Sequence, residues 1–163
     1  IVGQSADGGS NGDGAVRCVY MSTGTCLSGF TLMNGHTRRT YTEHCEGWPK
    51  YWTCWITDES QASGGGLWCE SSDCVISNCI LRNNAAYLNG GGAMRGTFFN
   101  CLFVSNSASL DGGGFYGAGE LDSCRLIWNT ALRNGGGACG GALSSCLVYG
   151  NSAQSGPVAN ANV

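Results

Sequence analysis

The sequence predicts an all-β fold, a right-handed parallel β-helix in which short strands wind through stacked coils. Three observations predict it: a unit of 22 or 23 residues recurs along the chain, every copy places the same residue types at the same positions, and glycine triplets separate the copies. A fixed period of about 20 to 50 residues is typical of a solenoid. Helical repeats need about 30 residues or more and contain few glycines, so strands fit this unit better.

Four cysteines mark the repeat, with spacings of 22, 23 and 22 residues: Cys79, Cys101, Cys124 and Cys146. Five positions after each cysteine stands an asparagine: Asn84, Asn106, Asn129 and Asn151. Two positions further on an alanine follows: Ala86, Ala108, Ala131 and Ala153. The clear repeats occupy residues 64–155 of a single β-helix domain, residues 1–163, for which we expect about six coils.

Residues alternate with a period of two after each cysteine, as they do in a strand. Cys101 and Phe103 would face the interior, while Leu102 and Val104 would face outward. The inward positions keep their character from copy to copy, whereas the outward positions vary. We therefore expect rows of equivalent residues stacked at about 4.8 Å, the spacing of neighbouring strands. Parallel crossovers are almost always right-handed, which predicts the handedness.

The residue types in these rows suit a structural role. Stacked asparagines hydrogen-bond along a row and tolerate turn geometry, and glycine triplets permit tight corners. Inward-facing cysteines behave as small hydrophobic residues, and parallel side chains in the same rotamer rarely meet disulfide geometry. We interpret both rows as structural ladders, with the cysteines mostly reduced.

The N-terminal part departs from the repeat. Residues 1–14 indicate the end of a strand followed by an exposed loop. Residues 16–20 and 27–34 predict the strands of a first coil. Residues 35–63 break the period, and we expect them to form one long loop insertion at a corner of the solenoid.

Two disulfides are predicted outside the ladder. Cys45 and Cys54 lie in the insertion, where a bridge would close a short loop and contribute about 2 to 3 kcal/mol. Cys18 and Cys69 end similar stretches, Val-Arg-Cys and Leu-Trp-Cys, so a bridge between adjacent coils is plausible. The 11 cysteines of the chain indicate an oxidising compartment, and hence a secreted protein or one at a cell surface.

Gly-Gly-Ala, at residues 91–93 and 136–138, is paired with an apolar-x-x-Asn motif, as from Leu81 to Asn84 and from Phe103 to Asn106. This pairing resembles the repeats of the chlamydial polymorphic outer-membrane proteins and of the wider set of bacterial surface proteins built of right-handed parallel β-helix repeats. The resemblance covers about residues 64–155, with a weaker echo at residues 29–34. It implies a secreted or surface-displayed, adhesin-like protein and names no catalytic residue.

Composition and charge exclude several classes of function. The net charge is −3 and Lys50 is the single lysine, so no basic cluster favours nucleic acid or an anionic membrane. No run of about 18 apolar residues predicts a membrane span. We expect no cofactor. His36, His44, Cys45 and Cys54 include zinc-ligand types, but their spacing matches no zinc module, so we expect no metal site.

An enzyme is the competing class, in particular a polysaccharide lyase or hydrolase acting on carbohydrate. Such a β-helix enzyme would need two carboxylates facing one groove, or acids for calcium with a basic residue on one outer face. Asp111, Glu120 and Asp122 lie in different parts of one coil, and no row of acids recurs. We therefore expect no catalysis.

A third interpretation concerns the aromatic residues of the insertion. Exposed together, they would stack on sugar rings or anchor a surface protein, since interface hot spots favour tryptophan and tyrosine. In the alternative, they cover the flank of a coil as a small core. These residues are Trp48, Tyr51, Trp52 and Trp55.

The ends of the solenoid suggest a function. Terminal coils expose unpaired strand edges, and neither end of the sequence predicts a cap. Either the chain belongs to a longer β-helix, or its ends stack on one another in a contact that generates filaments. The sequence thus favours a structural or adhesin-like protein that associates with itself through its end coils.

Overall fold

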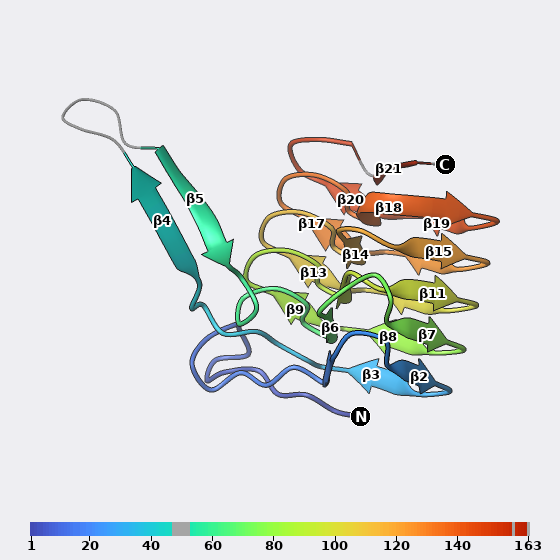
Figure 1. Ribbon diagram of the computed structural model, residues 1–163, viewed down its shortest axis with the longest axis horizontal. Helices are drawn as coiled ribbons and strands as arrows, with labels where there is room; N and C mark the ends of the chain where they lie inside the picture. The colour runs from blue at the N-terminus through green and yellow to red at the C-terminus, as the bar shows by residue number, and fades with distance from the viewer. Residues whose placement is uncertain (47–52, 158, 163) are drawn as a thin grey trace.

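The computed structural model describes residues 1–46, 53–157 and 159–162. Every regular element in these ranges is a β-strand, and most strands stack above one another along one axis (Figure 1). The protein is therefore the all-β parallel solenoid that the repeat predicts. A two-stranded hairpin projects from one side of it (Figure 1).

Three strands precede the hairpin: β1 (Val19–Met21), β2 (Cys26–Ser28) and β3 (Thr31–Met33). The hairpin consists of β4 (Thr42–Glu46) and β5 (Thr53–Asp58). The repeats then supply the turns of the solenoid. Their strands are β6 (Leu67–Cys69), β7 (Val75–Ser77), β8 (Ile80–Arg82) and β9 (Ala85–Ala86); β10 (Ala93–Met94), β11 (Thr97–Phe99), β12 (Leu102–Val104) and β13 (Ser107–Ala108); β14 (Phe115–Tyr116), β15 (Glu120–Asp122), β16 (Arg125–Ile127) and β17 (Thr130–Ala131); and β18 (Ala138–Ser144), β19 (Leu147–Tyr149), β20 (Ser152–Ala153) and β21 (Ala159–Asn162).

Strands at equivalent positions pair in parallel and form three sheets along the solenoid. A 10-stranded sheet has the order β1-β6-β10-β14-β18-β15-β11-β7-β2, with β21 beside β18, and β18 joins its two rows. The others have the orders β19-β16-β12-β8-β3 and β20-β17-β13-β9. The register is that of the repeat, because Phe103 pairs with Leu81 on one side and with Leu126 on the other.

The solenoid has about four turns, so the prediction of about six coils is wrong. The sheet β20-β17-β13-β9 receives one strand from each turn and contains four. The N-terminal segment adds only an isolated bridge at its edge, between His36 and Ala85. At the other end the chain contributes β21 alone. Both end segments are therefore incomplete turns, which the count from sequence had treated as whole coils.

Rows of apolar side chains fill the interior. Phe98 is fully buried. The centroid of its ring lies 5.0 Å from that of Phe103 and 5.8 Å from that of Phe115, and both pairs pack edge to face. At the corner before the short strands, Gly90 and Gly112 adopt φ angles of 65° and 66°, which other residues adopt only with strain. The packed rows position every outward residue of the solenoid.

The insertion is a β-hairpin and not an irregular loop. β4 and β5 are antiparallel, with Cys45 directly opposite Cys54. The predicted disulfide joins these two residues, with an S–S distance of 2.13 Å. Residues flanking the hairpin return to the solenoid wall, where the buried Thr37 hydroxyl donates a hydrogen bond of 3.1 Å to the Ala62 carbonyl.

Candidate functional site

The asparagine row is a continuous ladder of hydrogen bonds inside the solenoid. Asn84 donates its backbone N–H and its Nδ2 to Oδ1 of Asn106, each at 3.0 Å. Asn106 makes the same two bonds to Asn129, and Asn129 to Asn151. Each Nδ2 also donates to the carbonyl of an apolar residue one coil earlier, as Asn106 does to Leu81. Each turn thus needs an acceptor from the next turn.

The ladder stays open at the C-terminal end of the solenoid. Nδ2 of Asn151 donates to the Leu126 carbonyl at 2.7 Å. Neither its backbone N–H nor its second Nδ2 hydrogen has an acceptor among the described residues. In every earlier turn, Oδ1 of the following asparagine receives these two donors. Asn151 therefore presents the pattern that one further turn would satisfy.

Strand β19 forms an open sheet edge beside Asn151. The Leu147 N–H donates to Cys124 and the Tyr149 carbonyl accepts from Trp128, so both residues direct their backbone groups toward β16. Successive residues of a strand alternate, and the N–H and C=O of Val148 between them therefore point away from the solenoid. Leu147 and Tyr149 are 49% and 63% exposed as whole residues. An unpaired edge of this kind is a template for another strand.

The opposite end of the same sheet carries a partial strand. Val2 forms a parallel bridge with Met33, and the Met33 N–H donates to the Ile1 carbonyl at 3.0 Å. The first residues therefore continue the sheet beyond β3, as the sequence predicted for the end of a strand. The asparagine ladder ends at Asn84 on this side of the solenoid. Asn34 lies at the level of Asn83, and it is the backbone N–H of Gly35 that donates a hydrogen bond of 2.8 Å to Oδ1 of Asn84.

Each ladder cysteine joins two turns by weak hydrogen bonds. Cys79 and Cys101 each donate a backbone N–H to the sulfur of the next cysteine at 3.5 Å, and the Cys124 thiol donates to the Phe98 carbonyl. Cys79, Cys101 and Cys124 are buried free thiols, whereas Cys146, in the last turn, is half-buried. This arrangement fits the structural interpretation of the row.

The predicted Cys18–Cys69 bridge is not formed, and both residues are free. Val19 pairs with Leu67, which places Met21 and not Cys18 beside Cys69. The register expected from the similar tripeptides is therefore shifted by three residues, because Met21 occupies the position predicted for Cys18. The Cys18 thiol points instead to the Met33 carbonyl, at 3.4 Å.

The aromatic residues of the insertion lie mostly beyond what the structure describes. Trp48, Tyr51 and Trp52 are outside the described residues. Trp55 lies in β5 with its backbone opposite His44. The described part of the hairpin, β4 and β5, stands off the body of the solenoid (Figure 1). The binding surface expected of these residues, and the alternative of a small core, both stay predictions.

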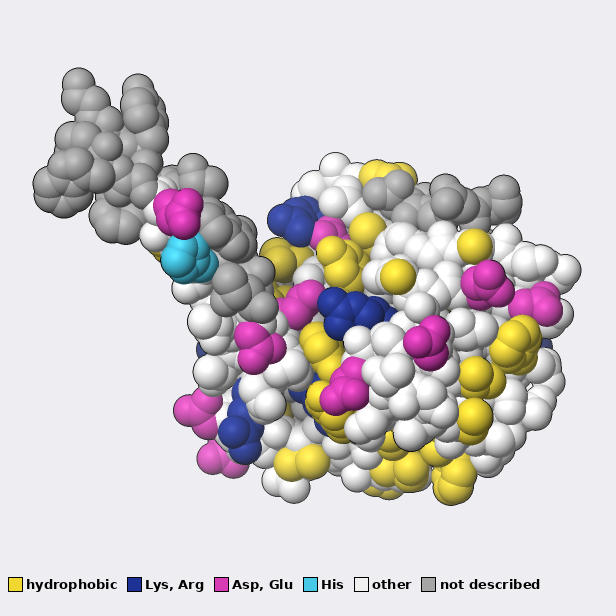
Figure 2. Space-filling view, in the orientation of Figure 1, with side chains coloured by type: hydrophobic (Ala, Val, Ile, Leu, Met, Phe, Trp, Pro, Cys, Tyr) yellow, Lys and Arg dark blue, Asp and Glu magenta, His cyan; other side chains and the backbone are white. Residues whose placement is uncertain are grey.

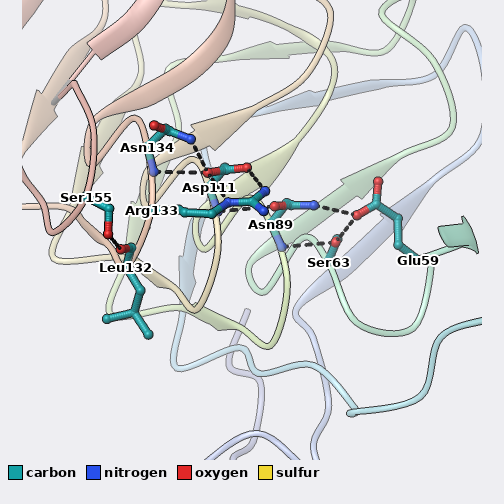
Figure 3. Close-up of polar contacts among 8 residues, drawn as sticks. All are labelled: Glu59, Ser63, Asn89, Asp111, Leu132, Arg133, Asn134 and Ser155. Atoms are coloured by element: carbon teal, nitrogen blue, oxygen red, sulfur yellow. Dashed lines mark hydrogen bonds and ion pairs between the residues drawn. The ribbon is translucent and has the colours of Figure 1, made fainter. Parts of the chain in front are cut away.

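A second polar row, which the sequence analysis missed, links residues next to the glycine triplets (Figure 3). The carboxylate of the buried Asp111 accepts hydrogen bonds from the Arg133 guanidinium and from both the backbone and the side chain of Asn134. Burial alone would raise the pKa of Asp111, but these hydrogen bonds hold it below its usual value. A carboxylate so fully occupied is a structural group.

The row continues from Asp111 toward the hairpin. The Asp111 N–H donates to Oδ1 of Asn89, whose Nδ2 donates to the Glu59 carboxylate, and that carboxylate also accepts from the Ser63 hydroxyl (Figure 3). The signal was present in the sequence, since a polar residue precedes every glycine triplet. These residues are Ser63, Asn89, Asp111 and Asn134.

Two of the acids weighed for an enzyme, Asp73 and Glu120, lie close to one surface depression. Asp73 and Glu120 line one shallow depression of about 360 Å³ together with Thr97. None of the residues that line it is a lysine or arginine. Two carboxylates suit acid–base hydrolysis. The basic residue expected of a lyase is not beside them.

The residues weighed for zinc lie on different elements. His36 bridges to Ala85 in the solenoid, whereas His44 lies in the hairpin and contacts Glu46 at 3.0 Å. The thiols of Cys45 and Cys54 are joined in the disulfide. The described residues contain no group of three or more His, Cys, Asp or Glu arranged to hold a metal ion.

Comparison with protein-family models, with curated proteins and with solved structures finds no match to this chain. The parallel solenoid is thus established by the structure itself, and the resemblance to the chlamydial and other bacterial surface repeats stays a prediction. In the part of the chain that the structure describes, there is no helix of the length and apolar character needed to cross a membrane.

Proposed function

We propose that this protein is a non-catalytic extracellular scaffold, structural or adhesin-like, whose solenoids stack end to end. The observation that carries the proposal is the open C-terminal edge, where Val148 and Asn151 present backbone and side-chain donors outward. Every equivalent donor in the interior turns is satisfied by the turn above it. One further turn would satisfy these donors, and in this proposal a second copy supplies it.

The geometry of the sheet with the order β19-β16-β12-β8-β3 supports a head-to-tail contact. Its two outermost members are β19 at one end and the segment around Val2 at the other, and all pairs along it are parallel. Translation of one copy along the solenoid axis would therefore place its N-terminal segment around Val2 beside β19 of the next copy, in parallel orientation. Such a heterologous contact does not close on itself, so it generates filaments or extends a stalk.

The disulfide supports a location outside the cytoplasm. Bridges such as Cys45–Cys54 form and persist in oxidising compartments, where burial shields the free thiols of Cys79, Cys101 and Cys124. A position at a bacterial cell surface rests on the resemblance of the repeats alone. The hairpin standing off the solenoid would be available to a carbohydrate or protein ligand at such a surface (Figure 2).

Light scattering across a concentration series and electron microscopy of the native protein test the proposal. We expect particles that lengthen with concentration and whose mass is a multiple of 16.9 kDa. Val148→Pro removes the outward N–H of the edge strand and should abolish the lengthening. Val148→Ala is the matched control, because it also loses packing but keeps the N–H. A monomer at every concentration, or equal assembly by the two variants, contradicts the proposal.

A further inference from the structure

Three neighbouring strands of the solenoid, β8, β12 and β16, present an outward face that is apolar except for two arginines. The middle residue of each strand points inward and is completely buried, namely Leu81, Phe103 and Leu126. The residues on either side therefore point outward, and each is at least partly exposed. We call these six residues the lateral face: Ile80, Arg82, Leu102, Val104, Arg125 and Ile127.

The only charges on the lateral face are positive. None of the residues of β8, β12 and β16 is an acid, and the same holds for β3 and β19, which flank them in the sheet. The chain has a net charge of −3 although this face carries +2, so the remaining residues together carry −5. Neither Arg82 nor Arg125 forms an ion pair with a described carboxylate. The net charge, from which the sequence analysis argued against an anionic membrane, conceals this separation.

Trp128 stands at the corner that ends β16, in a backbone conformation that bulky residues rarely adopt. Its φ angle is 53°, in the left-handed region, and the residue is 59% exposed. The equivalent corners of the two preceding turns carry the smaller polar residues Asn83 and Ser105. The indole lies over Gly150, where a Cβ atom would be 2.4 Å from Cδ1 of Trp128. Strained residues cluster at ligand contacts, so this exposed ring indicates an apolar contact with a partner.

This combination of side chains matches the surface of an anionic lipid bilayer. Tryptophan is enriched at the boundary between lipid and water, because its ring is apolar and its N–H is polar. The stem of an arginine covers apolar surface while its guanidinium reaches a phosphate, which it binds with two parallel hydrogen bonds. The Arg82 side chain lies along the sheet in this way, since its Nη2 donates to Sδ of Met33 at 3.3 Å. A bilayer supplies both an apolar and an anionic partner.

We propose that the lateral face docks on an anionic lipid surface, with Arg82 and Arg125 on lipid phosphates and Trp128 in the interfacial layer. The solenoid axis lies parallel to the lipid surface in this arrangement, because the sheet runs along that axis. Docking is peripheral and attaches the scaffold to a cell surface. It does not depend on end-to-end stacking, which uses the two ends of the sheet, whereas β8, β12 and β16 lie between them.

Flotation with lipid vesicles tests the docking, using vesicles of phosphatidylcholine alone and vesicles of equal parts phosphatidylcholine and phosphatidylglycerol. We expect the natural protein to float with the anionic vesicles and to be released as the salt concentration rises. The double variant Arg82→Gln/Arg125→Gln should bind them about tenfold more weakly, or less. Its matched control is Arg38→Gln/Arg39→Gln, which removes the same charge from two exposed residues outside the lateral face. The control should bind like the natural protein.

Trp128→Asn tests the apolar part of the contact while preserving the fold. Asparagine tolerates the left-handed region, as Asn83 does at the equivalent corner, so the melting temperature should not fall. Binding to the anionic vesicles should be several times weaker, while assembly measured by light scattering should match that of the natural protein.

Four outcomes would overturn the docking. In the first, the natural protein does not float with the anionic vesicles, which would favour an acidic protein as the partner of this face. In the second, vesicles of phosphatidylcholine alone bind it equally well. In the third, the two double variants bind alike, so that the position of the charge does not matter. In the fourth, Trp128→Asn binds as tightly as the natural protein.

Discussion

Oδ1 of Asn129 accepts two hydrogen bonds from Asn106, one from its backbone N–H at 3.0 Å and one from its Nδ2 at 2.9 Å. Both residues are completely buried. One amide oxygen thus satisfies two interior donors of the preceding turn. The ladder couples the turns through side chains as well as through backbone strands, and this coupling can be measured.

We expect Asn129→Ala to lower the free energy of unfolding by at least about 3 kcal/mol, because it leaves two donors of Asn106 buried without an acceptor. Urea denaturation followed by circular dichroism measures the change. Thr130→Ala, at the adjacent exposed position, is the control and should cost less than about 0.5 kcal/mol. Similar losses for the two variants would show that the ladder does not stabilise the fold.

The neighbouring residues Phe98 and Phe99 test the assignment of the interior. Phe98 is completely buried against two other rings, whereas Phe99 is 39% exposed. Phe98→Ala should cost about 3 to 5 kcal/mol through lost packing and a cavity. Phe99→Ala should cost less than about 1 kcal/mol. If Phe99→Ala were the more damaging in urea denaturation, the inward and outward faces would be reversed.

The Asp111–Arg133 contact predicts a pH dependence of stability. The pKa of Asp111 is lower in the folded protein than its ordinary value, so its contribution is complete above the ordinary value of 3.8 and is lost as the pH falls through the folded value. The Asp111→Asn variant should be less stable than the natural protein at neutral pH. The difference should shrink in acid, as thermal melts at pH 7 and near pH 3 will measure. A constant difference would contradict the expectation.

The free thiols should differ sharply in reactivity. Cys26 is exposed on β2, whereas Cys69 is completely buried. Burial raises the pKa of the Cys69 thiol and so reduces its reactive thiolate. A thiol reagent followed by peptide mapping should label Cys26 in the native protein and Cys69 only after denaturation. The labelling of the Cys26 peptide in the native protein should disappear in Cys26→Ser. Labelling of Cys69 before denaturation would contradict the expectation and would mean that the coil opens locally.

Much of the fold could be predicted because the repeat is regular. The spacings of 22 or 23 residues between successive ladder cysteines indicate the register, since units of nearly constant length place equivalent residues above one another. The first coil could not be aligned in this way, because the hairpin lies between it and the repeats. Asn34 was therefore grouped with the motif, although Gly35 occupies the level of the ladder.

The candidate sites were less predictable than the fold. The open edge at the C-terminal end follows from the sequence as a general property of solenoids, but the direction of the Val148 backbone groups follows from the observed hydrogen bonds. The lateral face has no counterpart in the sequence analysis, which found no basic cluster. Arg82 and Arg125 belong to different copies of the repeat, and the stacking of these copies places both on one side of the solenoid.

The sequence by itself determined the parallel solenoid, its inward rows and the Cys45–Cys54 pair, because these depend on local period and on short separations. Only the tertiary structure decided the number of turns and the separation of Cys18 from Cys69. The physical reason is that a repeat encodes which neighbours stack. Contacts across an irregular insertion are set by how the whole chain packs.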